Sequence, residues 1–103
     1  MNRWNIPPAL ERKIIRRDRR CVYCGLKFAA RTSSRRNKPS WEHINNDEHD
    51  IRLANVARCC IACNASKTTK TIAQWLNSDY CRARGITRKT VAKVVRAALR
   101  ADG

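Results

Sequence analysis

Two cysteine pairs constrain this chain more than any other feature. Cys21 with Cys24 and Cys60 with Cys63 each form a Cys-x2-Cys pair, and 35 residues separate the pairs. Each pair places two sulfurs close enough to hold one ion, and four thiolates around one ion form a common structural zinc site. Since the chain shows no secretory signal, we expect metal ligands rather than disulfides. The spacing therefore predicts a structural Zn²⁺ that joins two distant segments and adds folding free energy to a chain of 103 residues.

The second pair has an alternative form, because Cys59 directly precedes Cys60. We favour Cys60, which repeats the spacing of the first pair, over the Cys-x3-Cys arrangement that Cys59 would give. A redox dithiol is a weaker alternative, since no thioredoxin-like pattern accompanies the pairs. Cys59 and Cys81 are then expected to be small buried hydrophobic residues. Four sulfur ligands leave no open position for water, so the zinc site by itself predicts no catalysis.

The charge of the chain indicates a polyanionic partner. There are 23 Lys and Arg residues against 8 Asp and Glu, which gives a formal net charge of +15. Nucleic acid is the simplest such partner, and a merely solvated, highly charged surface is the alternative. The chain contains no apolar run of about 18 residues, so we expect no membrane partner. Without a secretory signal we expect a cytoplasmic protein in a prokaryotic or phage-like setting.

Hydrophobic periodicity predicts helices over residues 7–20, 63–78 and 87–101, and short strands over residues 40–44 and 53–60. Thr87 is the expected N-cap of the last helix. Alternation along the first strand places Trp41 and His43 on one face and Glu42 on the other. We therefore expect a single α+β domain over residues 1–103. Its zinc-stapled core would cover about 7–78, with basic amphipathic helices at both ends, the second at about 87–101.

The adjacent residues Glu42 and His43 begin the only acidic stretch, and they have two interpretations: a surface ion pair, or a metal ligand beside a general base. The neighbouring motifs favour the second. In order, they are Cys21–Cys24, Trp41–Ile44, Asn55 to Cys63, and Asn64–Lys67. Together they resemble the HNH endonucleases, the ββα-metal nucleases, over roughly residues 7–75. The resemblance implies a β-hairpin and a helix that grip one divalent cation and hydrolyse phosphodiester bonds of DNA, as an endonuclease or nickase.

The resemblance also implies a role for each matching residue. His43 falls on the general base, Glu42 on the acidic metal ligand, and Asn55 on the asparagine that bridges the hairpin and orients the histidine. Asn64 falls on the second metal ligand, and Lys67 on a basic position near the substrate backbone. Glutamate replaces the commoner aspartate at the first ligand, and asparagine replaces histidine at the second, which makes this an H-N-N variant. Two oxygen ligands suit Mg²⁺ or Mn²⁺ better than zinc.

Several alternatives stay open from the sequence. His43 could be a structural histidine, Asn55 a turn residue and Asn64 a helix cap. A non-catalytic, zinc-stapled nucleic-acid-binding module explains the charge and the cysteines, but it leaves Glu42 and His43 unexplained. RNA or branched DNA could replace duplex DNA as the substrate, and the last helix could form a homodimer. We expect little or no sequence specificity from phosphate contacts alone. The residues expected to make those contacts are Arg16, Arg17, Arg35, Arg36, Lys38 and Lys67.

Overall fold

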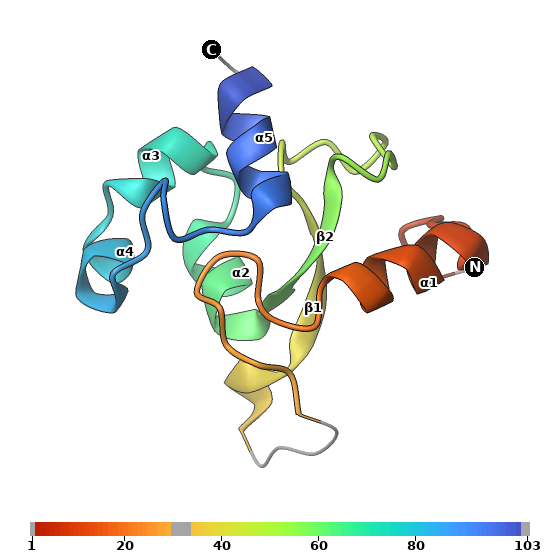
Figure 1. Ribbon diagram of the computed structural model, residues 1–103, viewed down its shortest axis with the longest axis horizontal. Coiled ribbons are helices and arrows are strands. Elements are labelled where there is room, and N and C mark those ends of the chain that lie inside the picture. Colours follow the sequence, from red (N-terminus) through yellow and green to blue (C-terminus); the bar gives the residue numbers. More distant parts are fainter. Residues whose placement is uncertain (1, 30–33, 102–103) are drawn as a thin grey trace.

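A computed structural model describes residues 2–29 and 34–101, and over these ranges the chain is a small α+β protein (Figure 1). None of the helices in the described ranges is long and apolar enough to cross a membrane. In chain order the elements are α1 (Pro8–Arg17), the 3-10 helix η1 (Arg35–Asn37), β1 (Pro39–His43), β2 (Val56–Cys60), α2 (Ile61–Lys67), α3 (Ile72–Leu76), α4 (Asp79–Arg84) and α5 (Lys93–Ala101).

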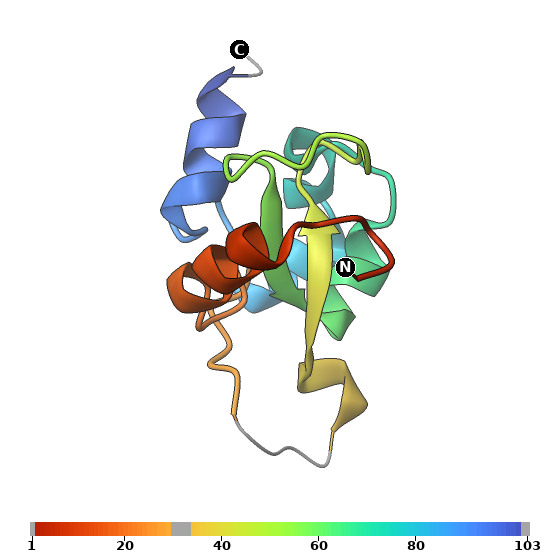
Figure 2. The ribbon, with the colours of Figure 1, turned by 90° about the vertical axis from the view of Figure 1, so that its right-hand side faces the viewer.

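The two strands form an antiparallel hairpin in which His43 pairs with Val56 and Glu42 pairs with Ala57. Because side chains alternate along a strand, Glu42 faces α2 while His43 faces the opposite side. Figure 2 shows α1 and the N-terminal segment, in red, on one side of the hairpin and α2, in green, on the other. The hairpin therefore separates two layers, and each layer receives one of the two adjacent site residues.

Each face of the hairpin covers its own hydrophobic core. Ile6, Ile14 and Val56 are the buried members of the smaller core, which lies against α1. The larger core lies on the α2 side and includes Tyr23 and Trp75, whose rings meet edge to face at 4.9 Å. This second core joins the first cysteine pair to the helices that follow the hairpin.

The prediction of one helix over 63–78 is wrong, because the chain forms two helices there. α2 ends at Lys67, and Thr68 adopts a positive φ of 49° that no helix accommodates. Thr71 then begins α3 with a capping box, in which its hydroxyl accepts from the Gln74 backbone and the Gln74 side chain accepts from the Thr71 backbone. The run of polar threonines thus favours a new helix start over continuation. The short helix α4 was not predicted at all.

The last helix also begins later than predicted. α5 starts at Lys93, and Thr87 caps no helix: its carbonyl accepts from the backbone N–H groups of Thr90 and Val91 in a tight turn. The backbone N–H of Ala92 donates to the Val22 carbonyl at 2.9 Å, which fixes this segment to the first cysteine pair. That tertiary hydrogen bond replaces the first turns of the expected helix. The first helix ends at Arg17, three residues before the predicted end at residue 20. The second strand starts at Val56 rather than at the predicted residue 53.

Candidate metal centre and candidate active site

The four cysteines of the two pairs come together at one point. The Sγ atoms of Cys21, Cys24, Cys60 and Cys63 all lie within 4.8 Å of one another. Cys24 and Cys60 have their sulfurs 3.8 Å apart, and a tetrahedron with Zn–S bonds of about 2.3 Å has edges of about 3.8 Å. The four side chains therefore fit a metal ion, as the spacing predicted.

Local structure supports thiolate ligands in this cluster. The backbone N–H groups of Cys24 and Cys63 donate to the sulfurs of Cys21 and Cys60, both at 3.4 Å. The Tyr80 hydroxyl donates to the Cys63 sulfur at 3.2 Å. Hydrogen bonds among the four sulfurs lower the pKa of Cys24 and Cys60 and raise the pKa of Cys21 and Cys63. The backbone N–H and hydroxyl donors stabilise the negative charge that metal ligation requires.

Cys59 is excluded from the cluster by its position on the strand. Its side chain points to the other face of β2, where its sulfur lies 3.7 Å from the Ser40 hydroxyl. Burial raises the pKa of Cys59 and also that of Cys81. Both thiols are buried, as expected for small hydrophobic residues. The choice of Cys60 as the ligand over Cys59 agrees with this geometry.

Glu42 is buried and already satisfied by protein groups. Its Oε2 accepts a hydrogen bond from the Tyr23 hydroxyl at 2.7 Å, and its Oε1 accepts from the backbone N–H of His43 at 3.0 Å. The ammonium of Lys67 lies 3.4 Å from Oε2. Lys67 is fully buried and also donates to Asn46 Oδ1 at 2.7 Å. In this structure Lys67 therefore neutralises Glu42 and does not face a substrate backbone.

Asn64 lies one helical turn before Lys67 and faces the same strand. Its amide nitrogen donates to the Ser40 hydroxyl at 3.1 Å and to the Trp41 carbonyl at 3.2 Å. The helix thus places a neutral amide and an ammonium against β1 in the region where the resemblance implies two oxygen ligands. Because Lys67 compensates the charge of Glu42, this arrangement of Glu42 and Asn64 does not fit a divalent cation.

His43 occupies the opposite face of the same strand. Its side chain is buried beneath Trp4, whose ring meets the imidazole edge to face with centroids 5.4 Å apart. Within the described ranges, Nε2 of His43 is buried and has no hydrogen-bond partner. Burial lowers the pKa of His43 below its usual 6.5, against the opposing effect of nearby carboxylates. The imidazole is therefore neutral near pH 7 and has one nitrogen unused by the fold.

Asn55 closes the loop between the strands. Its Oδ1 accepts from the backbone N–H of Asn45 at 2.9 Å, and its amide donates to the Asp50 carbonyl at 2.9 Å. Its own carbonyl accepts from the backbone N–H of Ile44. These bonds bridge the hairpin, as the resemblance implies. They hold the backbone that follows His43, whereas among the described residues Asn55 makes no hydrogen bond with the His43 ring.

The predicted phosphate contacts differ in their surroundings. Arg17 donates to Asp18 at 2.7 Å and to the carbonyls of Leu53 and Val56, so its guanidinium fastens α1 to the hairpin. This geometry gives Arg17 a structural role that the sequence did not indicate. The remaining predicted residues are exposed and free to meet solvent: Arg16, Arg35, Arg36 and Lys38.

Three residues of the site were missed from the sequence. They are Tyr23, which contacts Glu42; Trp4, which contacts His43; and Asn46, which contacts Lys67. In the sequence, Tyr23 lies between two metal-ligand candidates, Trp4 precedes the first helix and Asn46 looks like a turn residue. No sequence pattern therefore indicated these contacts. Only Asn46, with a positive φ of 66°, has an unusual backbone. Comparisons with protein-family models, with curated proteins and with solved structures found no match.

Proposed function

We propose that this protein hydrolyses phosphodiester bonds of DNA, as an endonuclease or nickase of the HNH type that its motifs resemble. The observation that carries the proposal is the unpartnered Nε2 of His43. A buried polar atom without a hydrogen-bond partner is rare in folded proteins and costs free energy. A general base has a reason to keep such an atom, because its nitrogen must be free to accept a proton.

In this proposal the chain's own residues have distinct tasks. The neutral His43 accepts a proton from the attacking water, a step that contributes roughly 10²–10⁴-fold to rate in enzymes of this kind. Asn55 holds the loop after His43, and the exposed basic residues attract the phosphates. The four cysteines bind a structural Zn²⁺, which fixes the hairpin and α2 to the first cysteine pair.

The cation of the reaction is a separate question. Our sequence-based hypothesis places Mg²⁺ or Mn²⁺ on Glu42 and Asn64. As arranged, however, these side chains do not fit a divalent cation, so no step proposed here depends on one. A cation there would have to compete with the Lys67 ammonium, which lies 3.4 Å from Glu42 Oε2.

Plasmid nicking tests the proposal directly. Supercoiled plasmid is incubated with the protein alone, with Mg²⁺ and with Mn²⁺, and nicked and linear products are separated on a gel. We expect His43→Ala to lose nicking and the matched variant His49→Ala to keep it, because His49 is exposed and lies outside the hairpin strands. Equal nicking by wild type and His43→Ala would exclude His43 as the base. Competition with RNA, single strands and branched junctions identifies the preferred substrate.

A specific observation also favours the second candidate, a non-catalytic, zinc-stapled nucleic-acid-binding module. Glu42 is paired with Lys67 and Tyr23, and Trp4 lies over His43, so neither site residue is open to solvent. The charge and the cysteine cluster serve binding equally well. Tight DNA binding without cleavage in every cation arm would establish this candidate over the nuclease.

A further inference from the structure

Three hollows on the surface share Arg88 as a lining residue. The first, of about 710 Å³, lies between α3, α4 and the segment 85–89. The second, of about 510 Å³, lies between residues 44–46, α3 and α5. The third, of about 420 Å³, lies along α5. Since Ala73 lines the first two and Leu99 the last two, the three hollows adjoin one another, and together we call them the Arg88 groove.

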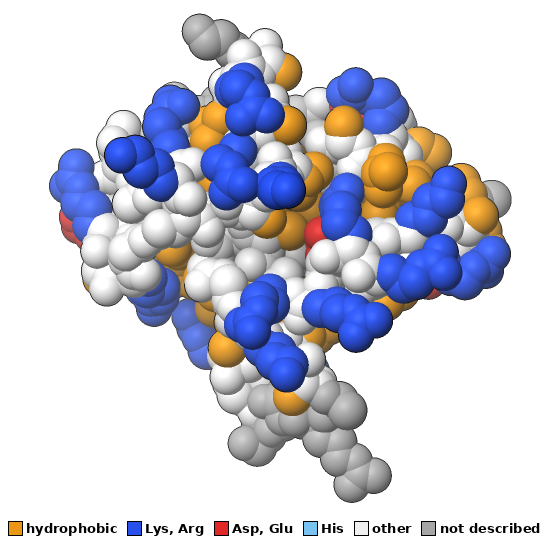
Figure 3. Space-filling model, in the orientation of Figure 1, with side chains coloured by type: hydrophobic (Ala, Val, Ile, Leu, Met, Phe, Trp, Pro, Cys, Tyr) orange, Lys and Arg blue, Asp and Glu red, His pale blue; other side chains and the backbone are white. Residues whose placement is uncertain are grey.

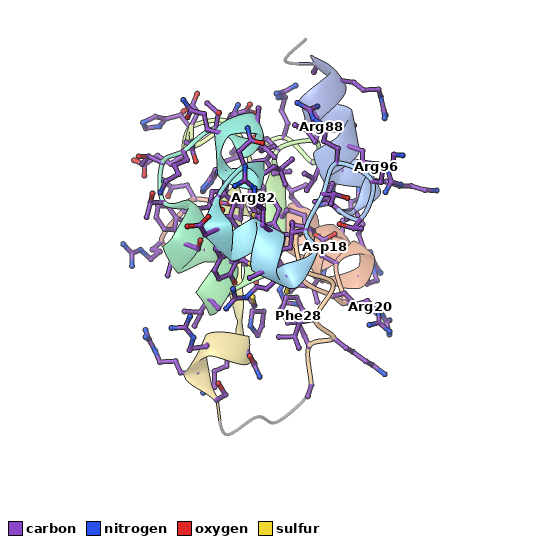
Figure 4. The ribbon with its side chains drawn as sticks, turned by 90° about the vertical axis from the view of Figure 1, so that its left-hand side faces the viewer. Asp18, Arg20, Phe28, Arg82, Arg88 and Arg96 are labelled. Atoms are coloured by element: carbon purple, nitrogen blue, oxygen red, sulfur yellow. The ribbon has the colours of Figure 1, made fainter. Side chains whose placement is uncertain are left out.

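The Arg88 groove is strongly basic. None of its lining residues is Asp or Glu, and its five cations are Arg82, Arg88, Lys89, Arg96 and Arg100. Within the described ranges, only Arg96 among these has a side-chain hydrogen bond, to the Val91 carbonyl. Figure 3 shows Lys and Arg side chains spread over this face of the molecule, the part around α5 included, and Figure 4 shows Arg82, Arg88 and Arg96 around α4 and α5. Four unpaired cations in one depression leave a strong attraction for an anion.

The groove reaches the end of β1 on the Glu42 side of the hairpin, opposite the side that the His43 ring faces. Ile44, Asn45 and Asn46 line its second hollow, and they directly follow His43 in the chain. Asn46 also accepts the hydrogen bond from the buried Lys67. A chain of phosphates lying in the groove would therefore pass the end of β1, where the loop held by Asn55 begins.

The lining favours one kind of polyanion. No aromatic residue lines any of the three hollows, whereas protein interfaces and single-strand binding sites are both enriched in aromatic side chains. A concave surface also offers no apolar wedge for a lipid bilayer. Guanidinium groups beside aliphatic side chains suit the phosphates and sugars of a duplex.

We infer that the Arg88 groove binds the phosphate backbone of duplex nucleic acid, with Arg88 as its central phosphate contact. A part for the groove in cleavage rests on the proposed function, but binding in the groove does not. The residues that carry the contact differ from the α1 and η1 residues that the sequence indicated, so the groove adds a second phosphate-binding surface.

Salt-dependent binding tests this inference without any cleavage. A labelled duplex is titrated by fluorescence anisotropy in buffer without added divalent cation, from about 50 to about 200 mM salt. We expect Arg88→Ala to weaken binding about tenfold at low salt and to reduce the salt slope by about one. Arg88→Lys should restore the slope, because it restores the charge.

Arg19→Ala is the matched control, since Arg19 is an exposed arginine that follows α1, lies outside the groove and is not among the predicted phosphate contacts. We expect it to change affinity much less than Arg88→Ala. Equal losses in both variants would overturn the inference, because they would show only the effect of net charge. Amide shifts on duplex binding should concentrate at residues 85–89 and 96–100, and shifts confined to α1 would also overturn it.

Competition experiments distinguish duplex nucleic acid from the other ligands that the groove could bind. Unlabelled duplex should displace the probe better than a single strand of the same length, a polyglutamate peptide or vesicles with anionic lipid. Displacement by the peptide or the vesicles at least as strong as that by duplex would overturn the inference. The two proposals can fail separately. If Arg88→Ala binds duplex as well as wild type does, the proposal that His43 is the base in nicking still stands. If nicking does not depend on His43, the proposal that the groove binds duplex still stands.

Discussion

The ammonium of Lys67 lies 3.4 Å from Oε2 of Glu42, in a place where the side chain of Lys67 has no exposure and that of Glu42 has 7%. A buried charge pair of this kind is costly to form, and removing one partner leaves the other uncompensated. Tyr23 and Asn46 complete the pair with hydrogen bonds of 2.7 Å each. The four groups connect the first cysteine pair, β1, its following turn and α2 in one polar network.

We predict that Lys67→Met lowers the free energy of unfolding by about 3–5 kcal/mol, because Glu42 would stay buried without its cation. Urea denaturation measures the change, and Lys70→Met is the control, since Lys70 is exposed three residues further on. The control should stay within about 0.5 kcal/mol of wild type. The double variant Glu42→Gln/Lys67→Met should lose less than the two single losses together. Strict additivity would show that the pair is not coupled.

Metal binding distinguishes two adjacent cysteines. We predict that Cys60→Ser loses bound zinc and unfolds at lower temperature, whereas Cys59→Ser keeps the metal, because only Cys60 has its sulfur in the four-cysteine cluster. Native mass spectrometry reports the metal content, and thermal unfolding reports stability. Retention of zinc by Cys60→Ser together with loss by Cys59→Ser would reverse the ligand assignment.

The sequence predicted the parts of this fold that local chemistry determines. The cysteine spacing predicted which four sulfurs come together, and alternation along the first strand predicted the opposed directions of Glu42 and His43. Prolines at 7 and 8 located the start of α1. These features depend on neighbours within a few residues, which is the range over which a single sequence is informative.

The rest depends on contacts between distant residues. Lys67 looked like a surface residue because lysine is rarely buried, and only the fold brings Glu42, Tyr23 and Asn46 around it. The late start of α5 follows from a hydrogen bond between Ala92 and Val22, 70 positions apart in the chain. Trp4 over His43 is likewise a tertiary contact. None of these has a periodic signature.

The lowered pKa of His43 makes stability depend on pH. The unfolded chain binds a proton near pH 6.5, whereas the folded protein does so only at lower pH, because burial disfavours the imidazolium. The free energy of unfolding should therefore fall as the pH decreases below 6.5. Urea denaturation across this range should show a flatter profile for His43→Gln than for His49→Gln. An unchanged profile in His43→Gln would show that His43 does not carry the effect.

Trp4 lies against the imidazole of His43. Its ring lies at 5.4 Å from the imidazole, and burial is the largest cause of the lowered pKa of His43. We predict that Trp4→Ala raises that pKa towards 6.5, whereas Trp4→Phe, which keeps an aromatic cover, stays close to wild type. NMR titration of the imidazole protons measures both, and His49 provides an internal reference in each spectrum. If Trp4→Ala left the pKa of His43 unchanged, the residues of the hairpin and α1, rather than the N-terminal segment, would be what shields the imidazole. A raised pKa would instead identify Trp4 as the cover that must move before His43 could act as the base in the reaction that we propose.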